Sequence, residues 1–121
     1  MRLLCADDEE DIRVILELAL SLDPEIDATI VSSGTELLDL AVNQPWDGFV
    51  LDGMMPGIDG YETCRRLKSD PRTSAVPVVF VSAKTRQEEI AHALSLGARA
   101  LLPKPFDPMT LAAELRAALG V

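Results

Sequence analysis

Five side chains that could act together on a phosphoryl group each stand at the end of a short apolar stretch: Asp7, Asp8, Asp52, Ser82 and Lys104. Crowded carboxylates repel one another, and a divalent cation with oxygen ligands usually relieves that repulsion. Mg²⁺ is the natural candidate because it takes one or two carboxylates and bridges to phosphate oxygens. The set predicts in-line phosphoryl transfer, in which Asp52 is the nucleophile that forms an acyl phosphate and Asp7 and Asp8 hold the metal. Lys104 and Ser82 then contact phosphate oxygens.

The apolar stretches before these residues predict the strands of a parallel sheet. Uninterrupted apolar runs indicate strands that are buried on both faces. The expected strands are Leu3 to Ala6, Ile26 to Val31, Phe49 to Leu51, Val76 to Val81 and residues 99–103. The carboxyl ends of parallel strands meet at one edge of the sheet, where ligands bind in open α/β folds. All five side chains should therefore lie together, and only the strand that ends at Val31 contributes no reactive group.

Helical spacing and capping signals between the strands predict five helices. Apolar residues recur at helical spacing after the first strand, at Ile12, Ile15, Leu16, Ala19 and Leu22. Capping boxes at Ser33, Asp59 and Thr85 open the next three helices, and Asp107-Pro108 caps the last one. Ile90, Ala93 and Leu94 should form the inner face of the fourth helix. Strands that alternate with helices need right-handed crossovers, which predicts a three-layer α/β sandwich.

Length and composition restrict the protein's class. The 121 residues fit a single domain, 1–121, and no apolar run approaches the roughly 20 residues of a membrane span. A net charge of −9 disfavours direct binding to nucleic acid or to an anionic membrane surface. The start of the chain shows no signal peptide, so a cytoplasmic location is expected. The two cysteines, Cys5 and Cys64, lack metal-site or disulfide spacing and are expected to be reduced and packed.

Four short motifs stand in order at the expected strand ends and span essentially the whole chain. They are Asp7-Asp8-Glu9, Asp52-x-Met54-Met55-Pro56-Gly57-x-Asp59-Gly60, Ser82-Ala83 and Lys104-Pro105-Phe106. Together they resemble the receiver domains of two-component response regulators. The resemblance implies a flavodoxin-like sheet of order 2-1-3-4-5 with five helices. It also implies Mg²⁺-dependent transfer of a phosphoryl group to Asp52 from the phosphohistidine of a sensor histidine kinase or a histidine phosphotransfer protein. The Met54 backbone carbonyl would be a further metal ligand, and the Lys104-Pro105 bond would be cis.

The resemblance further implies a signalling domain rather than an enzyme, one that promotes its own phosphotransfer and autodephosphorylation. Phosphorylation would shift a two-state equilibrium of the loop after Ser82, the fourth helix and the fifth strand. The face formed by the fourth helix, the fifth strand and the fifth helix would then bind an effector or form a homodimer. Leu101 departs from the family pattern, because an aromatic residue that rotates inward commonly stands three positions before the lysine. The sequence therefore does not determine how phosphorylation at the site would change that face.

Two side chains with possible chemistry of their own are expected to play ordinary roles. His92 lies in the middle of the fourth helix without a matched partner and should be an exposed residue, and Tyr61 should serve packing.

Particular residues argue against alternative functions. A receiver-like interaction module that signals without phosphorylation is the main alternative, and the complete set of acids, hydroxyl and lysine argues against it. A haloacid-dehalogenase-type phosphatase would need a second aspartate where Met54 stands. A flavin-binding flavodoxin is disfavoured because acids occupy the first loop, where backbone amides would cradle a phosphate. The kinase, the output, the oligomeric state and the phosphoryl lifetime stay open, as does membership of a longer chain.

Overall fold

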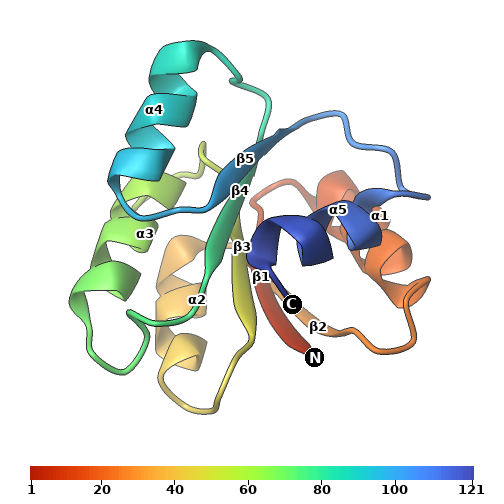
Figure 1. The fold of residues 1–121 in the computed structure, drawn as a ribbon, viewed down its shortest axis with the longest axis horizontal. Coiled ribbons are helices and arrows are strands. Elements are labelled where there is room, and N and C mark those ends of the chain that lie inside the picture. Colours follow the sequence, from red (N-terminus) through yellow and green to blue (C-terminus); the bar gives the residue numbers. More distant parts are fainter.

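The computed structural model describes residues 1–121, in which five strands alternate with five helices (Figure 1). The strands are β1 (Arg2–Ala6), β2 (Asp27–Val31), β3 (Gly48–Leu51), β4 (Val78–Ser82) and β5 (Ala100–Pro103). The helices are α1 (Glu10–Ser21), α2 (Gly34–Ala41), α3 (Gly60–Ser69), α4 (Gln87–Ser95) and α5 (Leu111–Leu119). None of these helices has both the length and the apolar character needed to cross a lipid bilayer.

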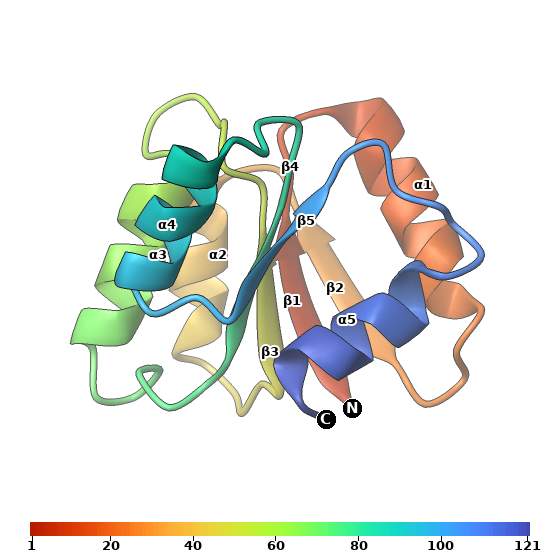
Figure 2. The ribbon, with the colours of Figure 1, turned by 45° about the horizontal axis from the view of Figure 1, so that its top comes forward.

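The strands form one parallel sheet of order β2-β1-β3-β4-β5, which is the order that the family resemblance implied. The register continues across β2, β1 and β3, since Cys5 of β1 pairs with Ile30 of β2 and with Val50 of β3. Figure 2 shows α2, α3 and α4 on one face of the sheet and α1 and α5 on the other. The predicted three-layer flavodoxin-like sandwich is therefore confirmed.

Two apolar cores lie on either side of the sheet. Alternate residues of each strand point to opposite faces, so Leu4 and Phe49 pack toward α2, α3 and α4, whereas Cys5 and Val50 pack toward α1 and α5. This two-sided burial explains the continuous apolar runs in the sequence. Cys5 and Cys64 are both free and buried, as expected from their spacing.

Two of the four expected helix caps are formed. The side chains of Ser33 and Asp59 accept hydrogen bonds from the backbone N–H groups of Glu36 and Glu62. The prediction for Thr85 was wrong, because α4 begins one residue later, after Arg86, without a side-chain cap. The prediction for Asp107 was also wrong: its carboxylate accepts from the Met109 N–H in a separate turn, and α5 starts only at Leu111.

The inner faces of α1 and α4 also differ from the sequence reading. Ile15, Leu22 and Leu94 were expected to face the core but are exposed. On α1 the buried residues are Leu16, Ala19 and Leu20. The stripe of the helix that contacts the sheet is narrower than the surface that its apolar residues occupy. As a result, α1 carries apolar side chains that face away from the core.

Candidate functional site

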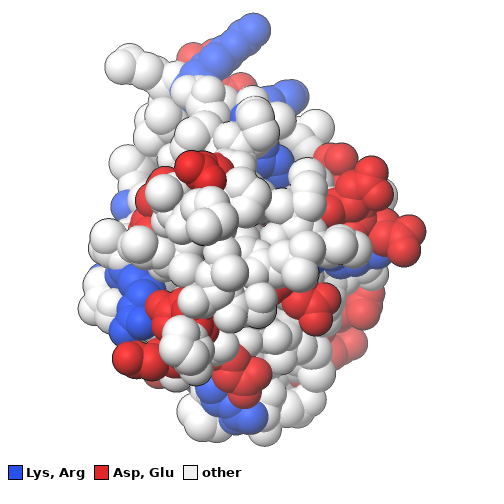
Figure 3. Space-filling view, turned by 90° about the vertical axis from the view of Figure 1, so that its right-hand side faces the viewer, with Lys and Arg blue, Asp and Glu red and all other residues white.

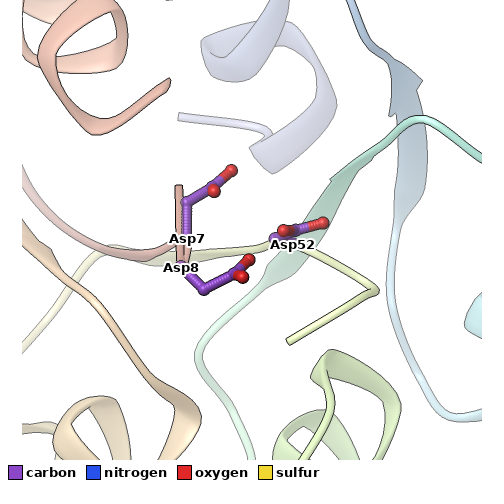
Figure 4. A group of neighbouring side chains, drawn as sticks. All are labelled: Asp7, Asp8 and Asp52. Carbon is purple, nitrogen blue, oxygen red and sulfur yellow. The ribbon is translucent and has the colours of Figure 1, made fainter. Parts of the chain in front are cut away.

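The five side chains singled out in the sequence stand at one edge of the sheet. Asp7 and Asp8 follow β1, Asp52 follows β3, Ser82 is the last residue of β4, and Lys104 follows β5. Figure 4 shows the carboxyl groups of Asp7, Asp8 and Asp52 side by side at the ends of β1 and β3. One carboxylate oxygen from each lies within 4.8 Å of the others. The structure therefore brings the three predicted acids together.

Backbone hydrogen bonds hold these side chains in place, because the ladder continues one residue past the strands. The Asp7 N–H donates to the carbonyl of Val31, and the Asp52 N–H donates to the carbonyl of Ala6, at 3.1 and 3.0 Å. The Lys104 N–H donates to the carbonyl of Ser82 at 2.9 Å. The backbones of these three residues are thus each fixed by a neighbouring strand, and their positions inherit the rigidity of the sheet.

Lys104 supplies a positive charge beside two of the three acids. Its Nζ lies 2.6 Å from Asp7 Oδ2 and 3.4 Å from Asp52 Oδ2. All three side chains are less than a tenth exposed, whereas Asp8 faces the solvent. A single ammonium cannot neutralise three carboxylates, so the cluster keeps an excess of negative charge. The Lys104-Pro105 peptide bond is cis, as the resemblance implied.

This arrangement shifts the pKa values of two of its members. Burial, together with the negative charge of Asp7, raises the pKa of Asp52 to about 6, although Lys104 and a hydrogen bond from the Met54 N–H act in the opposite direction. Burial acts to lower the pKa of Lys104, but the hydrogen bond to Asp7 and the charge of Asp52 outweigh it and raise this pKa overall. At neutral pH, Asp52 is therefore mainly ionised and Lys104 is charged.

Ser82 lies on the other side of Asp52 from Asp7. It is fully buried, and its Oγ accepts a hydrogen bond from the Lys84 N–H at 3.2 Å. This bond uses only an acceptor site of the oxygen, so the hydroxyl hydrogen remains free to donate. A Cβ on Gly53, the residue after Asp52, would lie only 3.3 Å from Ser82 Oγ. The hydroxyl thus borders the space beside Asp52.

The loop from Asp52 to Gly60 is held close to the start of α3. Met54 N–H donates to Asp52 Oδ1 at 3.2 Å, and Gly60 N–H donates to the Gly53 carbonyl, also at 3.2 Å. A Cβ on Gly60 would collide with the backbone carbonyl oxygen of Asp52, so only glycine fits there. The Met54 carbonyl as a metal ligand stays a prediction.

Tyr61 is a neighbour of the site that the sequence reading missed. Its hydroxyl oxygen would lie 3.4 Å from a Cβ on Gly53, in the same space that Ser82 borders. The signal in the sequence was the pairing of a glycine after Asp52 with an aromatic residue after Gly60, and it could not be interpreted without the position of α3. Leu101 lies in β5 opposite Phe80 and is half-buried.

The comparisons with known proteins agree with this geometry. Residues 3–116 match the family model described as the response regulator receiver domain. The chain belongs to this family. It is therefore a receiver domain of two-component response regulators, which is a signalling domain.

Curated relatives that match this receiver domain are longer than the chain. The chain is 38% identical over 97% of its length to the transcriptional regulatory protein AfsQ1 of Streptomyces coelicolor, of which it covers 50%. It is 37% identical over 95% of its length to the response regulator PleD of Caulobacter vibrioides, of which it covers 25%. The chain thus spans half or less of the length of these curated relatives.

A solved structure matches this receiver domain over nearly its whole length. The chemotaxis protein CheY4 of Vibrio cholerae superposes with a TM-score of 0.90 at 26% identity, and the match covers 98% of both chains.

Proposed function

We propose that residues 1–121 act as one phosphoacceptor domain, in which Asp52 receives a phosphoryl group from the phosphohistidine of a sensor histidine kinase or a histidine phosphotransfer protein. The observation that carries this proposal is the placement of Asp52. Its carboxylate is buried between two further acids and an ammonium, yet it lies at an edge of the sheet that a donor can reach. In-line phosphoryl transfer requires such an oriented nucleophile surrounded by charge-stabilising groups.

The transfer uses the ionised form of Asp52. A carboxylate oxygen of Asp52 forms a bond to phosphorus while the bond from phosphorus to the donor's imidazole nitrogen breaks, and the electron pair of that bond stays on the imidazole. The Met54 N–H on Oδ1 orients the carboxylate. Lys104 Nζ, which lies 3.4 Å from Oδ2, is positioned to pair with a phosphoryl oxygen. The Ser82 hydroxyl donates to another of these oxygens.

Asp7, Asp8 and Asp52 fit a Mg²⁺ ion. Their oxygens are hard ligands that approach within 4.8 Å of one another, and their excess negative charge favours a cation. The Met54 carbonyl is the fourth protein ligand in this proposal. When bound, Mg²⁺ would neutralise negative charge on the phosphoryl oxygens. Asp7 is shared between this ligand set and the hydrogen bond to Lys104, so it holds the ammonium next to Asp52.

The protein that donates the phosphoryl group must cover the carboxyl edge of the sheet. Helix α1 begins at this edge, and an apolar stripe of Val14, Leu18 and the C-cap residue Leu22 runs along it, each side chain more than half exposed. Figure 3 shows the side of the molecule with α1 and α5, where an uncharged surface lies between groups of acidic side chains. We assign this stripe to the donor protein, because it adjoins the site and offers apolar area that the core does not use.

The phosphorylated domain is proposed to act through a second surface. The face of α4, β5 and α5 lies next to Ser82 and Lys104, and it would bind an effector or a second copy of the domain. Autodephosphorylation would return the domain to its resting state. We propose a cytoplasmic location, where the kinase and effector act.

Intact mass after incubation with acetyl phosphate, with and without Mg²⁺, tests the phosphoacceptor function. The wild type should gain one phosphoryl group only with Mg²⁺, and Asp52→Asn should gain none. Asp11→Asn is the matched control, because Asp11 is an exposed acid of the same segment that lies outside the cluster. No gain in folded wild-type protein would contradict the proposal and favour an interaction module that works without phosphorylation.

A further inference from the structure

Tyr61 connects the layer around the site with helix α4. It stands in the first turn of α3, and its ring stacks on Phe80 of β4 with 5.1 Å between ring centroids and an angle of 24°. The Tyr61 ring also lies next to His92 of α4, with 4.7 Å between the ring centroids and an angle of 43°. Aromatic contacts of this kind fix the relative position of both partners. A movement of Tyr61 therefore reaches both the sheet and α4.

The hydroxyl end of Tyr61 points to the space beside Asp52. Gly53 leaves this space open, and a Cβ there would lie 3.4 Å from the Tyr61 hydroxyl oxygen and 3.3 Å from Ser82 Oγ. The two hydroxyl groups thus border the same small volume. Burial, and then the charges of Glu89, Asp59 and Asp52, raise the pKa of Tyr61, so its phenol stays protonated and can donate a hydrogen bond.

Glu89 of α4 has a carboxylate oxygen that accepts no hydrogen bond. Its Oε2 is buried and has no hydrogen-bond partner. A buried unpartnered acceptor costs free energy, which a new hydrogen bond would recover. Glu89 also borders a cavity of about 370 Å³, which the β4–α4 loop lines with Ala83, Lys84, Thr85 and Arg86. The loop that follows Ser82 therefore has room to move toward or away from α4.

We propose that Tyr61 is the positioning residue that transmits the state of the Asp52 site to α4. In the resting state its hydroxyl lies beside Gly53 and Ser82, and Glu89 Oε2 lacks a donor. When the Ser82 hydroxyl turns to a phosphoryl oxygen on Asp52, the Tyr61 hydroxyl turns away from Gly53 and donates to Glu89 Oε2. This new hydrogen bond draws α4, with His92, toward α3. The inference rests on the proposed phosphoacceptor function and names the route by which the site would control α4.

The composition provides two selective probes for this route. The chain has a single tyrosine and a single histidine, which are Tyr61 and His92. With ¹³C-labelled tyrosine and histidine, each ring gives one set of NMR signals, and intact mass gives the phosphorylated fraction of the same sample. In the wild type, acetyl phosphate with Mg²⁺ should shift both signals in proportion to that fraction. In Asp52→Asn neither signal should shift.

Two substitutions separate the hydroxyl contact from the ring packing. Tyr61→Phe keeps the stacked ring and removes the donor, and Glu89→Ala removes the acceptor from the first turn of α4. Both should lose most of the His92 shift at equal phosphorylation. Glu88→Ala is the matched control, because Glu88 is the exposed neighbour of Glu89, and it should keep the wild-type shift.

The outcomes distinguish this route from the underlying chemistry. A wild-type His92 shift in Tyr61→Phe and Glu89→Ala, at equal phosphorylation, would overturn the role of Tyr61 while leaving Asp52 as the acceptor. Absence of a mass gain in the wild type would instead overturn the phosphoacceptor function, and with it the coupling.

Discussion

Neutralising Asp52 should stabilise the folded protein, even though it abolishes the proposed phosphorylation. In Asp52→Asn, one of three crowded carboxylates loses its charge. Lys104 keeps its closer partner, because its Nζ lies 2.6 Å from Asp7 and 3.4 Å from Asp52. The substitution thus removes repulsion without stranding the ammonium.

The expected gain can be worked out from the distances. At 4.8 Å and an effective dielectric constant of about 20, each repulsion of Asp52 by another acid costs about 3.5 kcal/mol. Two such repulsions exceed the attraction to Lys104 at 3.4 Å by about 2 kcal/mol. The rise in the pKa of Asp52 from 3.8 to about 6 corresponds to about 3 kcal/mol at neutral pH. Solvent at the open edge screens both values, so we expect about 1–3 kcal/mol.

This gain should depend on pH in a defined direction. Because the pKa of Asp52 is higher in the folded than in the unfolded protein, folding disfavours the ionised carboxylate. The cost is absent below pH about 4, develops as the pH rises to about 6 and is complete above that value. The stability difference between Asp52→Asn and the wild type should follow the same course.

Urea denaturation in EDTA, at several pH values and repeated with Mg²⁺, measures these effects. At pH 7 in EDTA, a free energy of unfolding about 1–3 kcal/mol higher than that of the wild type would raise the melting temperature by roughly 4–12 °C. Mg²⁺ should shrink the difference, because it stabilises the wild type through the same acids. Asp11→Asn should show no gain. An Asp52→Asn protein that is less stable than the wild type in EDTA would refute this reasoning.

Three further substitutions test other parts of the structure. Lys104→Ala should lower the free energy of unfolding by about 2–4 kcal/mol in EDTA, because it leaves buried carboxylates unpaired, and Mg²⁺ should restore part of the loss. Gly60→Ala should cost about 1–3 kcal/mol in urea denaturation, because its Cβ would meet the Asp52 carbonyl; unchanged stability would contradict the close approach. Hydrogen bonds from Arg65 and Arg66 lower the pKa of Glu62 to about 2, so its stabilisation is lost as the pH falls from about 4.5 toward 2. Glu62→Gln should flatten the acid side of the stability curve.

The strands and the members of the site were predictable because they depend on local patterns. Each apolar run ends at a polar residue, and a parallel sheet must bring these ends to one edge. Helix starts were less predictable. Ser33 and Asp59 cap α2 and α3 as expected. Thr85 and Asp107 are also typical capping residues, but α4 and α5 begin further along the chain. Side-chain capping competes with loop geometry, which the packing of distant segments determines.

The sequence could not predict which face of each helix is buried, for a similar reason. Ile15, Leu22 and Leu94 have helical spacing and apolar character, but the sheet accepts only the stripe that faces it. Which part of a broad apolar surface is buried depends on the angle at which a helix crosses the strands, and that angle is a property of the whole fold. Of these residues, Leu22 belongs, with Val14 and Leu18, to the stripe that we assign to the donor protein.

By itself, the sequence determined the fold class, the order of the elements and the residue types at the edge of the sheet, because hydrophobic periodicity and strand polarity act over a few residues. Only the tertiary structure decided the distances among Asp7, Asp52 and Lys104, and hence the raised pKa of Asp52. It also decided that Tyr61 reaches both Gly53 and His92. These contacts join segments that are far apart in the chain, and their electrostatic and packing energies depend on separations that no local pattern encodes.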